Sequence, residues 1–247
     1  MMKRQLLLGV GVLVLHSMAW SAEITVAAAA SLTDAFKVIA QSYEKKNPET
    51  KVNLTFASSG TLLQQLRYGA PIDVFASADE QTMNEAQKLA LIQKQTRTDF
   101  TQNRLVLISP MNSKVAVKSL NDLKRNEIEH IALGNPAHTP AGRYAQAVLE
   151  KQGLWNAVQP KVINTQNVRQ ALDYVARGET QVGFVFSSDV LSQKTKVRTL
   201  LQVPTVTPIH YPIAVTQTSK QVKQSQQFIS YVQSAEGQKV LRQYGFQ

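Results

Sequence analysis

The sequence contains no cysteine among its 247 residues. Disulfide bridges and thiolate metal sites are therefore excluded, and no cysteine is present to carry a lipid after an export signal. Histidine is also scarce: apart from His16 near the N-terminus, the chain has only His130, His138 and His210. These three lack close ligand spacing, such as two histidines one helical turn apart, so we expect no bare metal ion and no cofactor.

Long apolar runs are missing too, except at the N-terminus. The chain begins with a basic segment, 1–4, followed by an apolar run, 6–15, and a small-x-small pattern at 19–21. This order predicts a signal peptide over 1–21, cleaved before Ala22 or Glu23. An uncleaved membrane anchor is the alternative, but the run is shorter than the roughly 20 residues that span a bilayer. The absence of cysteine then favours a freely diffusing periplasmic protein.

A concentrated patch of positive charge is absent as well. The formal net charge is +10, and it falls to +8 when Lys3 and Arg4 are removed with the signal peptide. The basic residues are scattered, and none of their clusters carries interleaved aromatic residues, so nucleic-acid binding is not expected. A solvated basic surface explains the excess, and attraction of a small anion is the functional alternative.

Strand and helix patterns alternate along the remaining chain. Strands are predicted at 24–29, 52–57, 104–109, 130–134, 161–164, 181–186, 197–202 and 209–215, with a short one within 70–79. Helices are predicted at 32–47, 61–69, 80–89, 119–124, 141–153, 168–177, 221–233 and 235–244. This alternation predicts an α/β fold with doubly wound, mainly parallel sheets, in which ligands bind at the carboxyl ends of strands. No linker separates two halves, so two lobes would be joined by crossing strands, for which 99–107 and 203–214 are candidates.

Two serine-bearing turns follow the first two predicted strands. Ser31 comes after four consecutive alanines, and Ser58, Ser59 and Gly60 end the next strand. In both turns small side chains leave space beside a hydroxyl at an expected helix N-cap, where unpaired N–H groups and the positive end of the helix dipole also lie. Ser31 also fits a capping box with Asp34, which is a sufficient structural explanation. Two such turns side by side would suit a small anion.

Two further strand-to-helix turns lie later in the chain. Pro140 suits the first turn of a helix and leaves the N–H of Ala141 without an intrahelical acceptor. Asn167 is the expected N-cap of the helix at 168–177, with the N–H of Val168 just inside.

Short motifs recur in a characteristic order along the mature chain. They are AASLT at 29–33, FASS at 56–59, GAPIDVFASAD at 69–79, GNP at 134–136, PAGRYA at 140–145, NVR at 167–169 and RQYGF at 242–246. In this order the chain resembles the periplasmic molybdate-binding proteins of molybdate ABC importers. The resemblance implies a two-lobed, type II periplasmic binding protein fold, with lobe I at 22–103 and 210–247 and lobe II at 104–209.

The resemblance also implies a set of ligand contacts. By motif position these are the hydroxyls of Ser31 and Ser59, the backbone N–H groups of Ala141 and Val168, and the side chain at Phe186. In the best-known members the last contact is a tyrosine hydroxyl, which phenylalanine lacks. A hydrogen bond to a charged acceptor is worth about 1.5–3 kcal/mol. Either Ser187 or a water supplies the missing donor, or the site binds more weakly or prefers another oxyanion.

The donor chemistry limits the ligand. A fully ionised tetrahedral dianion needs only donors, whereas phosphate near neutral pH still carries a proton and needs an acceptor. None of the expected contacts is a carboxylate if Asp34 is engaged in its capping box, so molybdate, tungstate and sulfate fit better than phosphate. Arg143 and Arg169 could approach an anion, but an exposed arginine one turn into a helix is the simpler interpretation of each.

The predicted function is capture of molybdate, and also tungstate, for delivery to the membrane permease of an ABC importer by a monomeric protein. A receptor for sulfate or another small oxyanion is the alternative. A hydrolase would recruit Ser31 or Ser59 with His138 or His210, but the chain has no Gly-x-Ser-x-Gly motif.

Overall fold

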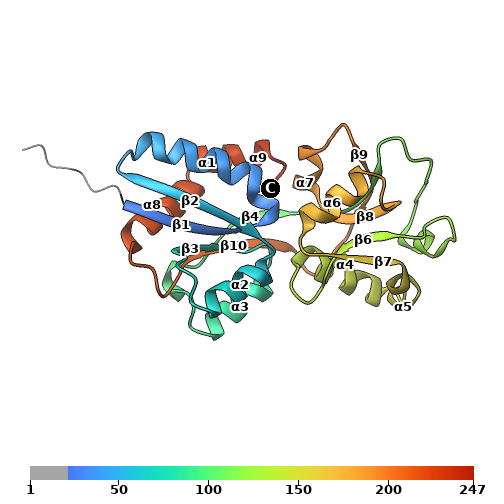
Figure 1. Ribbon diagram of the computed structural model, residues 1–247, viewed down its shortest axis with the longest axis horizontal. Coiled ribbons are helices and arrows are strands. Elements are labelled where there is room, and N and C mark those ends of the chain that lie inside the picture. Colours follow the sequence, from blue (N-terminus) through green and yellow to red (C-terminus); the bar gives the residue numbers. More distant parts are fainter. Residues whose placement is uncertain (1–21) are drawn as a thin grey trace, which may run out of the picture.

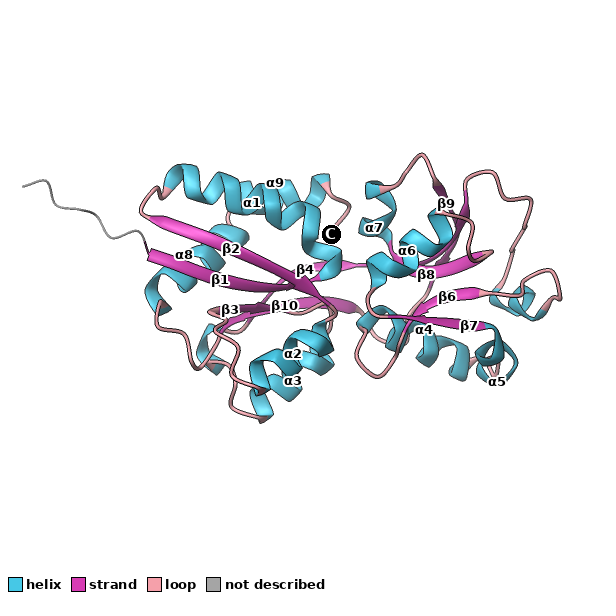
Figure 2. Cartoon of the chain, in the orientation of Figure 1, coloured by secondary structure: helices cyan, strands magenta, loops and turns pink. Residues whose placement is uncertain are grey.

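The computed structural model describes residues 22–247, so the predicted signal peptide at 1–21 lies outside the described residues. Two lobes lie side by side, each with one five-stranded sheet and flanking helices (Figures 1 and 2). Within residues 22–247, no helix combines the length and the apolar character needed to cross a membrane.

The first sheet has the strand order β2-β1-β3-β10-β4. Its strands are β1 (Ala22–Ala29), β2 (Thr50–Ala57), β3 (Val74–Ala76), β4 (Thr98–Asn103) and β10 (Ile209–Val215). Its helices are α1 (Thr33–Lys46), α2 (Ser59–Arg67), α3 (Glu80–Lys88), α8 (Val222–Gln233) and α9 (Ala235–Gln243). The helices α1 and α9 cover one face, and α2 and α3 cover the other (Figure 1).

The second sheet has the order β7-β6-β8-β5-β9. Its strands are β5 (Leu105–Pro110), β6 (Ile131–Gly134), β7 (Val162–Thr165), β8 (Val182–Phe186) and β9 (Val197–Val203). Its helices are α4 (Pro140–Lys151), α5 (Trp155–Val158), α6 (Val168–Ala176) and α7 (Ser187–Ser192). The helices α4 and α6 pack on opposite faces of this sheet (Figure 2).

The strand directions correct one expectation, because the sheets are mixed and not mainly parallel. Four strand pairs within residues 22–247 are parallel and four are antiparallel. Every antiparallel pair includes β5 or β10, strands that the chain enters directly from the other lobe. A strand that arrives from the opposite lobe runs against those built by local βαβ crossovers, which are parallel.

The chain passes between the sheets at two places. Only Arg104 separates β4 from β5, and the loop 204–208 joins β9 to β10. The candidate crossing segment 99–107 is therefore made of parts of two strands and not of one connection. Ile209, placed at the end of lobe II by the sequence, begins β10 of the first sheet and pairs with Asn103.

Most predicted elements appear within a few residues of their expected ends. The helix predicted at 119–124 is instead a short 3₁₀ helix, Leu120–Lys124, which Ser119 and Asp122 cap. The helices α5 and α7 have four and six residues, too short to show a helical apolar period, and the sequence analysis missed both.

The first turn of α4 depends on a close backbone approach. A Cβ atom added to Gly142 would lie 1.8 Å from the carbonyl oxygen of Gly134, so this turn can pack on the end of β6 only with glycine at position 142. The contact fixes the backbone of Pro140 and Ala141, which the sequence placed at the candidate site.

We expect Gly142→Ala to destabilise the second lobe. The methyl group forces a backbone shift, and such overpacking costs about 1–3 kcal/mol. Thermal unfolding of the mature chain would show a lower midpoint. The exposed Lys151 at the end of the same helix provides the control Lys151→Ala, and an equal midpoint for both variants would contradict the expected contact.

Candidate functional site

A small cavity lies where turns from both lobes meet. Its lining residues are Ala29, Ala30, Ser31, Ser58, Ser59 and Ala78 from the first lobe, and Thr139, Pro140, Ala141, Val168 and Phe186 from the second. The space open to the centre of a water-sized sphere is about 10 Å³, about the room that one water molecule needs. All five residues expected to contact the ligand therefore lie around one cavity.

A larger and more open groove of about 680 Å³ lies beside this cavity, between α3, α4 and the loop before β10. Its lining carries charges of both signs, from Asp79, Glu80 and Glu85 and from Lys88 and Arg143. The small cavity is the better candidate for an anion site, because hydroxyls and helix N-termini line it and no carboxylate does.

The local structure around Ser31 differs from the predicted capping box. Ser31 lies within a short 3₁₀ helix, Ala30–Leu32, and the N-cap position of α1 is Leu32, which makes no side-chain cap. The carboxylate of Asp34 instead binds Arg169 of the second lobe, with Oδ2 and Nη1 2.8 Å apart. The Ser31 hydroxyl is then free of the cap and lies 2.9 Å from the hydroxyl of Tyr211.

In the second serine turn, Ser58 and Ser59 have different hydrogen-bonding roles. Ser58 is the N-cap of α2 and accepts a hydrogen bond from the N–H of Thr61 at 3.3 Å. Ser59 is the first residue of the helix, and its hydroxyl oxygen accepts from the N–H of Ala78 at 2.9 Å. The Ser59 hydroxyl therefore keeps its own proton available to the cavity.

The two later turns supply backbone donors from the second lobe. Pro140 begins α4, and Asn167 caps α6 by accepting from the N–H groups of Arg169 and Gln170, both as predicted. Ala141 and Val168 lie in the first turns of these helices, where N–H groups have no acceptor within the helix. Both helix ends face the cavity with their positive dipole ends.

Phe186 forms an apolar wall of the cavity. Its ring is 1% exposed and packs edge-on against Tyr211 and Tyr144, with centroids 5.9 and 6.5 Å apart. Ser187, suggested as a substitute donor, is engaged elsewhere, because its hydroxyl donates to Oδ1 of Asn103 at 2.9 Å. The structure thus places no Ser187 hydroxyl at the cavity.

Arg143 and Arg169 are neither exposed nor lining the cavity. Arg143 binds the carboxylate of Asp79 through Nε at 3.0 Å and Nη2 at 2.6 Å, and so joins α4 to the start of α3. The side chains of Arg143 and Asp79 are 18% and 3% exposed. The interpretation of Arg143 as an exposed residue is therefore wrong, because an acceptor from the other lobe covers it.

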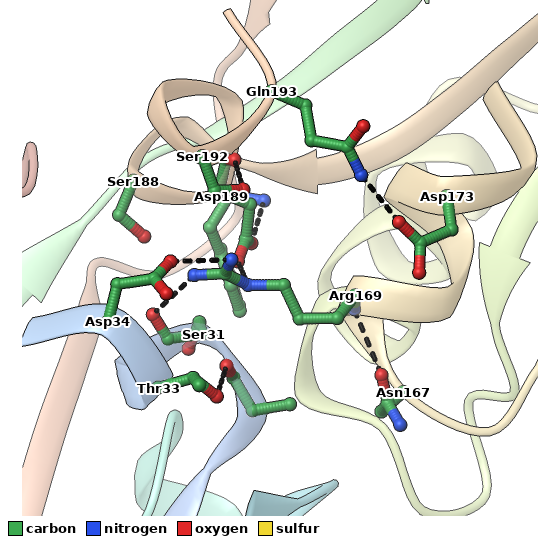
Figure 3. Close-up of polar contacts among 12 residues, drawn as sticks. Ser31, Thr33, Asp34, Asn167, Arg169, Asp173, Ser188, Asp189, Ser192 and Gln193 are labelled. Carbon is green, nitrogen blue, oxygen red and sulfur yellow. Dashed lines mark hydrogen bonds and ion pairs between the residues drawn. The ribbon is translucent and has the colours of Figure 1, made fainter. Parts of the chain in front are cut away.

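Arg169 lies between two carboxylates, as Figure 3 shows. It contacts Asp34 of the first lobe at 2.8 Å and the fully buried Asp189 of the second lobe at 2.7 Å. Burial disfavours the charged guanidinium, but the two carboxylates outweigh it, and the pKa of Arg169 is raised. The carboxylates nearest the cavity thus have arginine partners, and the groups left to face a ligand are neutral donors.

Asp189 gives Arg169 a structural role that can be tested without a ligand. Replacing Arg169 by methionine leaves a fully buried carboxylate without its ionic partner, which costs about 3–5 kcal/mol. We expect Arg169→Met to lower the unfolding midpoint by several degrees. Arg177→Met is the control at the end of the same helix, where the side chain is 69% exposed. Similar midpoints for the two variants would show that Asp189 does not depend on Arg169.

Sequence comparison places the chain among proteins of known class. Residues 24–247 match the model of the family described as bacterial extracellular solute-binding protein. The chain is 38% identical to the molybdate-binding protein ModA of Haemophilus influenzae over 93% of this chain and 92% of that protein. It is 35% identical to ModA of Escherichia coli over 94% and 91% of the two chains.

Structural comparison agrees on the fold. The periplasmic molybdate-binding protein of Azotobacter vinelandii superposes with a TM-score of 0.81 and 23% identity, covering 91% of this chain and 98% of that one. The matched proteins are binding proteins and not enzymes, so the hydrolase alternative is not supported. The chain belongs to the bacterial extracellular solute-binding proteins, in the group that includes the ModA molybdate-binding proteins.

Proposed function

We propose that this protein captures molybdate, and tungstate through the same contacts, in the cavity between its lobes. The observation that carries the proposal is the convergence of four neutral donors on one small cavity: two serine hydroxyls from the first lobe and two first-turn N–H groups from the second. The names of the related proteins support molybdate as the ligand.

Neutral donors are sufficient to bind a dianion in this setting. The cavity is almost closed to solvent, where hydrogen bonds to charged acceptors are stronger than in water. The first turns of α2, α4 and α6 add positive dipole ends. No carboxylate lines the cavity, so a ligand oxygen that carries a proton has no charged acceptor there.

Closure of the lobes links capture to transport. The N–H of Gly60 in α2 donates to the carbonyl oxygen of His138 in the second lobe at 3.0 Å, next to the cavity. Together with the Arg143–Asp79 and Arg169–Asp34 pairs, this contact joins the lobes around the ligand. A ligand bound by both lobes favours the closed state, whose combined surface the permease of an ABC importer would recognise. Export through the predicted signal peptide would place the protein in the periplasm.

Calorimetry of the mature chain with molybdate, tungstate, sulfate and phosphate tests the proposed ligand. We expect heat and tight binding with molybdate and tungstate, and no binding of phosphate at neutral pH. Tight sulfate binding with no heat from molybdate or tungstate would establish the alternative, a sulfate receptor.

Ser31→Ala tests the proposed site. Loss of one hydrogen bond to a charged acceptor costs about 1.5–3 kcal/mol, so molybdate affinity should fall tenfold or more. Ser230→Ala is the control, because the hydroxyl of Ser230 on α8 bonds only to its own helix, at the carbonyl of Gln226. Unchanged affinity in Ser31→Ala would remove Ser31 from the site.

Phe186→Tyr tests the apolar wall. A tyrosine hydroxyl at this position would add a donor to a cavity whose other polar contacts are all donors, so we expect tighter molybdate binding. Titration calorimetry under the same conditions gives the comparison. An affinity equal to or weaker than that of the unaltered protein would contradict this expectation.

A further inference from the structure

Both cavity serines lie against a second hydrogen-bonding group of the protein. For Ser59 this group is the N–H of Ala78, which can only donate, so the Ser59 oxygen accepts. A hydroxyl has a single proton, and that of Ser59 remains for a ligand. For Ser31 the second group is the hydroxyl of Tyr211 at 2.9 Å, and either oxygen could be the donor. The distance alone does not give the direction.

The direction follows from Asn103 at the end of β4. The backbone N–H of Arg104, which can only donate, lies 2.9 Å from Oδ1 of Asn103, and the hydroxyl of Ser187 donates to the same oxygen. The amide is therefore oriented with Nδ2 toward Tyr211, at 3.2 Å, and toward the hydroxyl of Ser188, at 2.8 Å. An amide nitrogen donates and does not accept, so the Tyr211 oxygen is an acceptor from Asn103.

The Tyr211 hydroxyl has one proton that it can donate. Its side chain is fully buried, and burial raises its pKa well above the ordinary value, so the phenol stays protonated. Its other hydrogen-bond partner among the described residues is the Ser31 oxygen. Tyr211 therefore donates to Ser31, and the proton of Ser31 is left for the cavity.

We propose that Tyr211 is a positioning residue that commits the Ser31 hydroxyl to donating toward the oxyanion, with Asn103 setting the direction of the chain of hydrogen bonds. This inference rests on the proposed function, since it assumes that the cavity binds an oxyanion. It adds a source of specificity: an unprotonated ligand oxygen accepts the Ser31 proton, whereas the proton of a protonated oxygen would face a hydroxyl that is already committed to donating.

The hydrogen bonds that link Asn103, Tyr211 and Ser31 lie where the two lobes join. Asn103 and Tyr211 belong to β4 and β10, the two strands beside the crossings between the lobes. Ser187 and Ser188, which fix the Asn103 amide, belong to α7 of the second lobe. The direction of the Ser31 proton therefore depends on contacts from both lobes at the joint between them.

A double-mutant cycle tests the proposal. Molybdate affinity is measured by calorimetry for the unaltered mature chain, Tyr211→Phe, Ser31→Ala and the double variant. We expect Ser31→Ala to weaken binding about tenfold or more, and Tyr211→Phe to weaken it at least about threefold, because the Ser31 proton is no longer directed. In the Ser31→Ala background, Tyr211→Phe should have no further effect. An equal loss in both backgrounds would mean that Tyr211 acts by packing alone, and would overturn the proposal.

Tyr43→Phe is the matched control. Tyr43 is also a buried tyrosine, but it lies in the first-lobe core, where its ring packs against Phe228 at 5.4 Å. Removing its hydroxyl should leave molybdate affinity unchanged. A loss equal to that of Tyr211→Phe would assign the effect to any buried tyrosine hydroxyl and would also overturn the proposal.

Asn103→Asp provides a second route if Tyr211→Phe does not fold. A carboxylate accepts from Tyr211, so the Tyr211 proton turns away from Ser31 and the Ser31 proton turns toward Tyr211. Asn103→Asp should lower molybdate affinity more when Ser31 is present than in the Ser31→Ala background. In that background only repulsion between the new charge and the dianion remains. Equal losses in the two backgrounds would contradict the proposed direction.

The outcomes separate this inference from the proposed function. Absence of molybdate and tungstate binding by the unaltered chain would overturn the proposed function, and the inference with it. Tight binding that Ser31→Ala weakens and Tyr211→Phe leaves intact would overturn the inference alone.

Discussion

The passage of the chain between the lobes at adjoining strands is the constraint on which the rest of the structure depends. β4 leaves the first lobe with only Arg104 before β5, and β10 returns beside β4, with Ile209 paired to Asn103. This return makes both sheets mixed, and it brings Asn103 into contact with Tyr211, which in turn contacts Ser31. A change in the angle between the lobes would require bending at these crossings. The cavity and the hydrogen-bonded residues Asn103 and Tyr211 lie next to them.

The charges around the cavity are arranged so that none of them faces it directly. Asp34 lies in the first turn of α1 and Asp79 is the N-cap of α3. Each would repel a dianion if it were unpaired. Arg143 and Arg169 of the second lobe neutralise them only when the lobes meet. In the proposed closure of the lobes, formation of these interlobe ion pairs would remove the repulsion in the same step. In the proposed complex the dianion would meet hydroxyl and backbone N–H donors and no carboxylate.

The residues that line the cavity were predicted well from the sequence where they depend on local structure, and poorly where they depend on distant contacts; their binding of a ligand stays a prediction. Turns after strands carry small residues and helix-start signals, so Ser31, Ser59, Ala141 and Val168 were found, and they do line one cavity. The capping box at Ser31 was wrong because Asp34 has a stronger partner in Arg169, 135 positions away along the chain. Such a pairing has no local signal. Tyr211 was missed for the same reason: its strand was predicted, but its contact with Ser31, 180 positions away along the chain, has no local signal.

Different kinds of protein donor occupy the hydroxyl oxygens of Ser31 and Ser59. Each needs a protein donor to occupy its oxygen, so that its single proton points to the ligand. Ser59 uses a backbone N–H, which no substitution at Ala78 other than proline would remove. Ser31 uses the side chain of Tyr211, and that side chain packs against Phe186, the position where a ligand-binding tyrosine was expected. Phe186 thus adds no hydroxyl to the cavity, and its ring packs against the side chain that contacts Ser31.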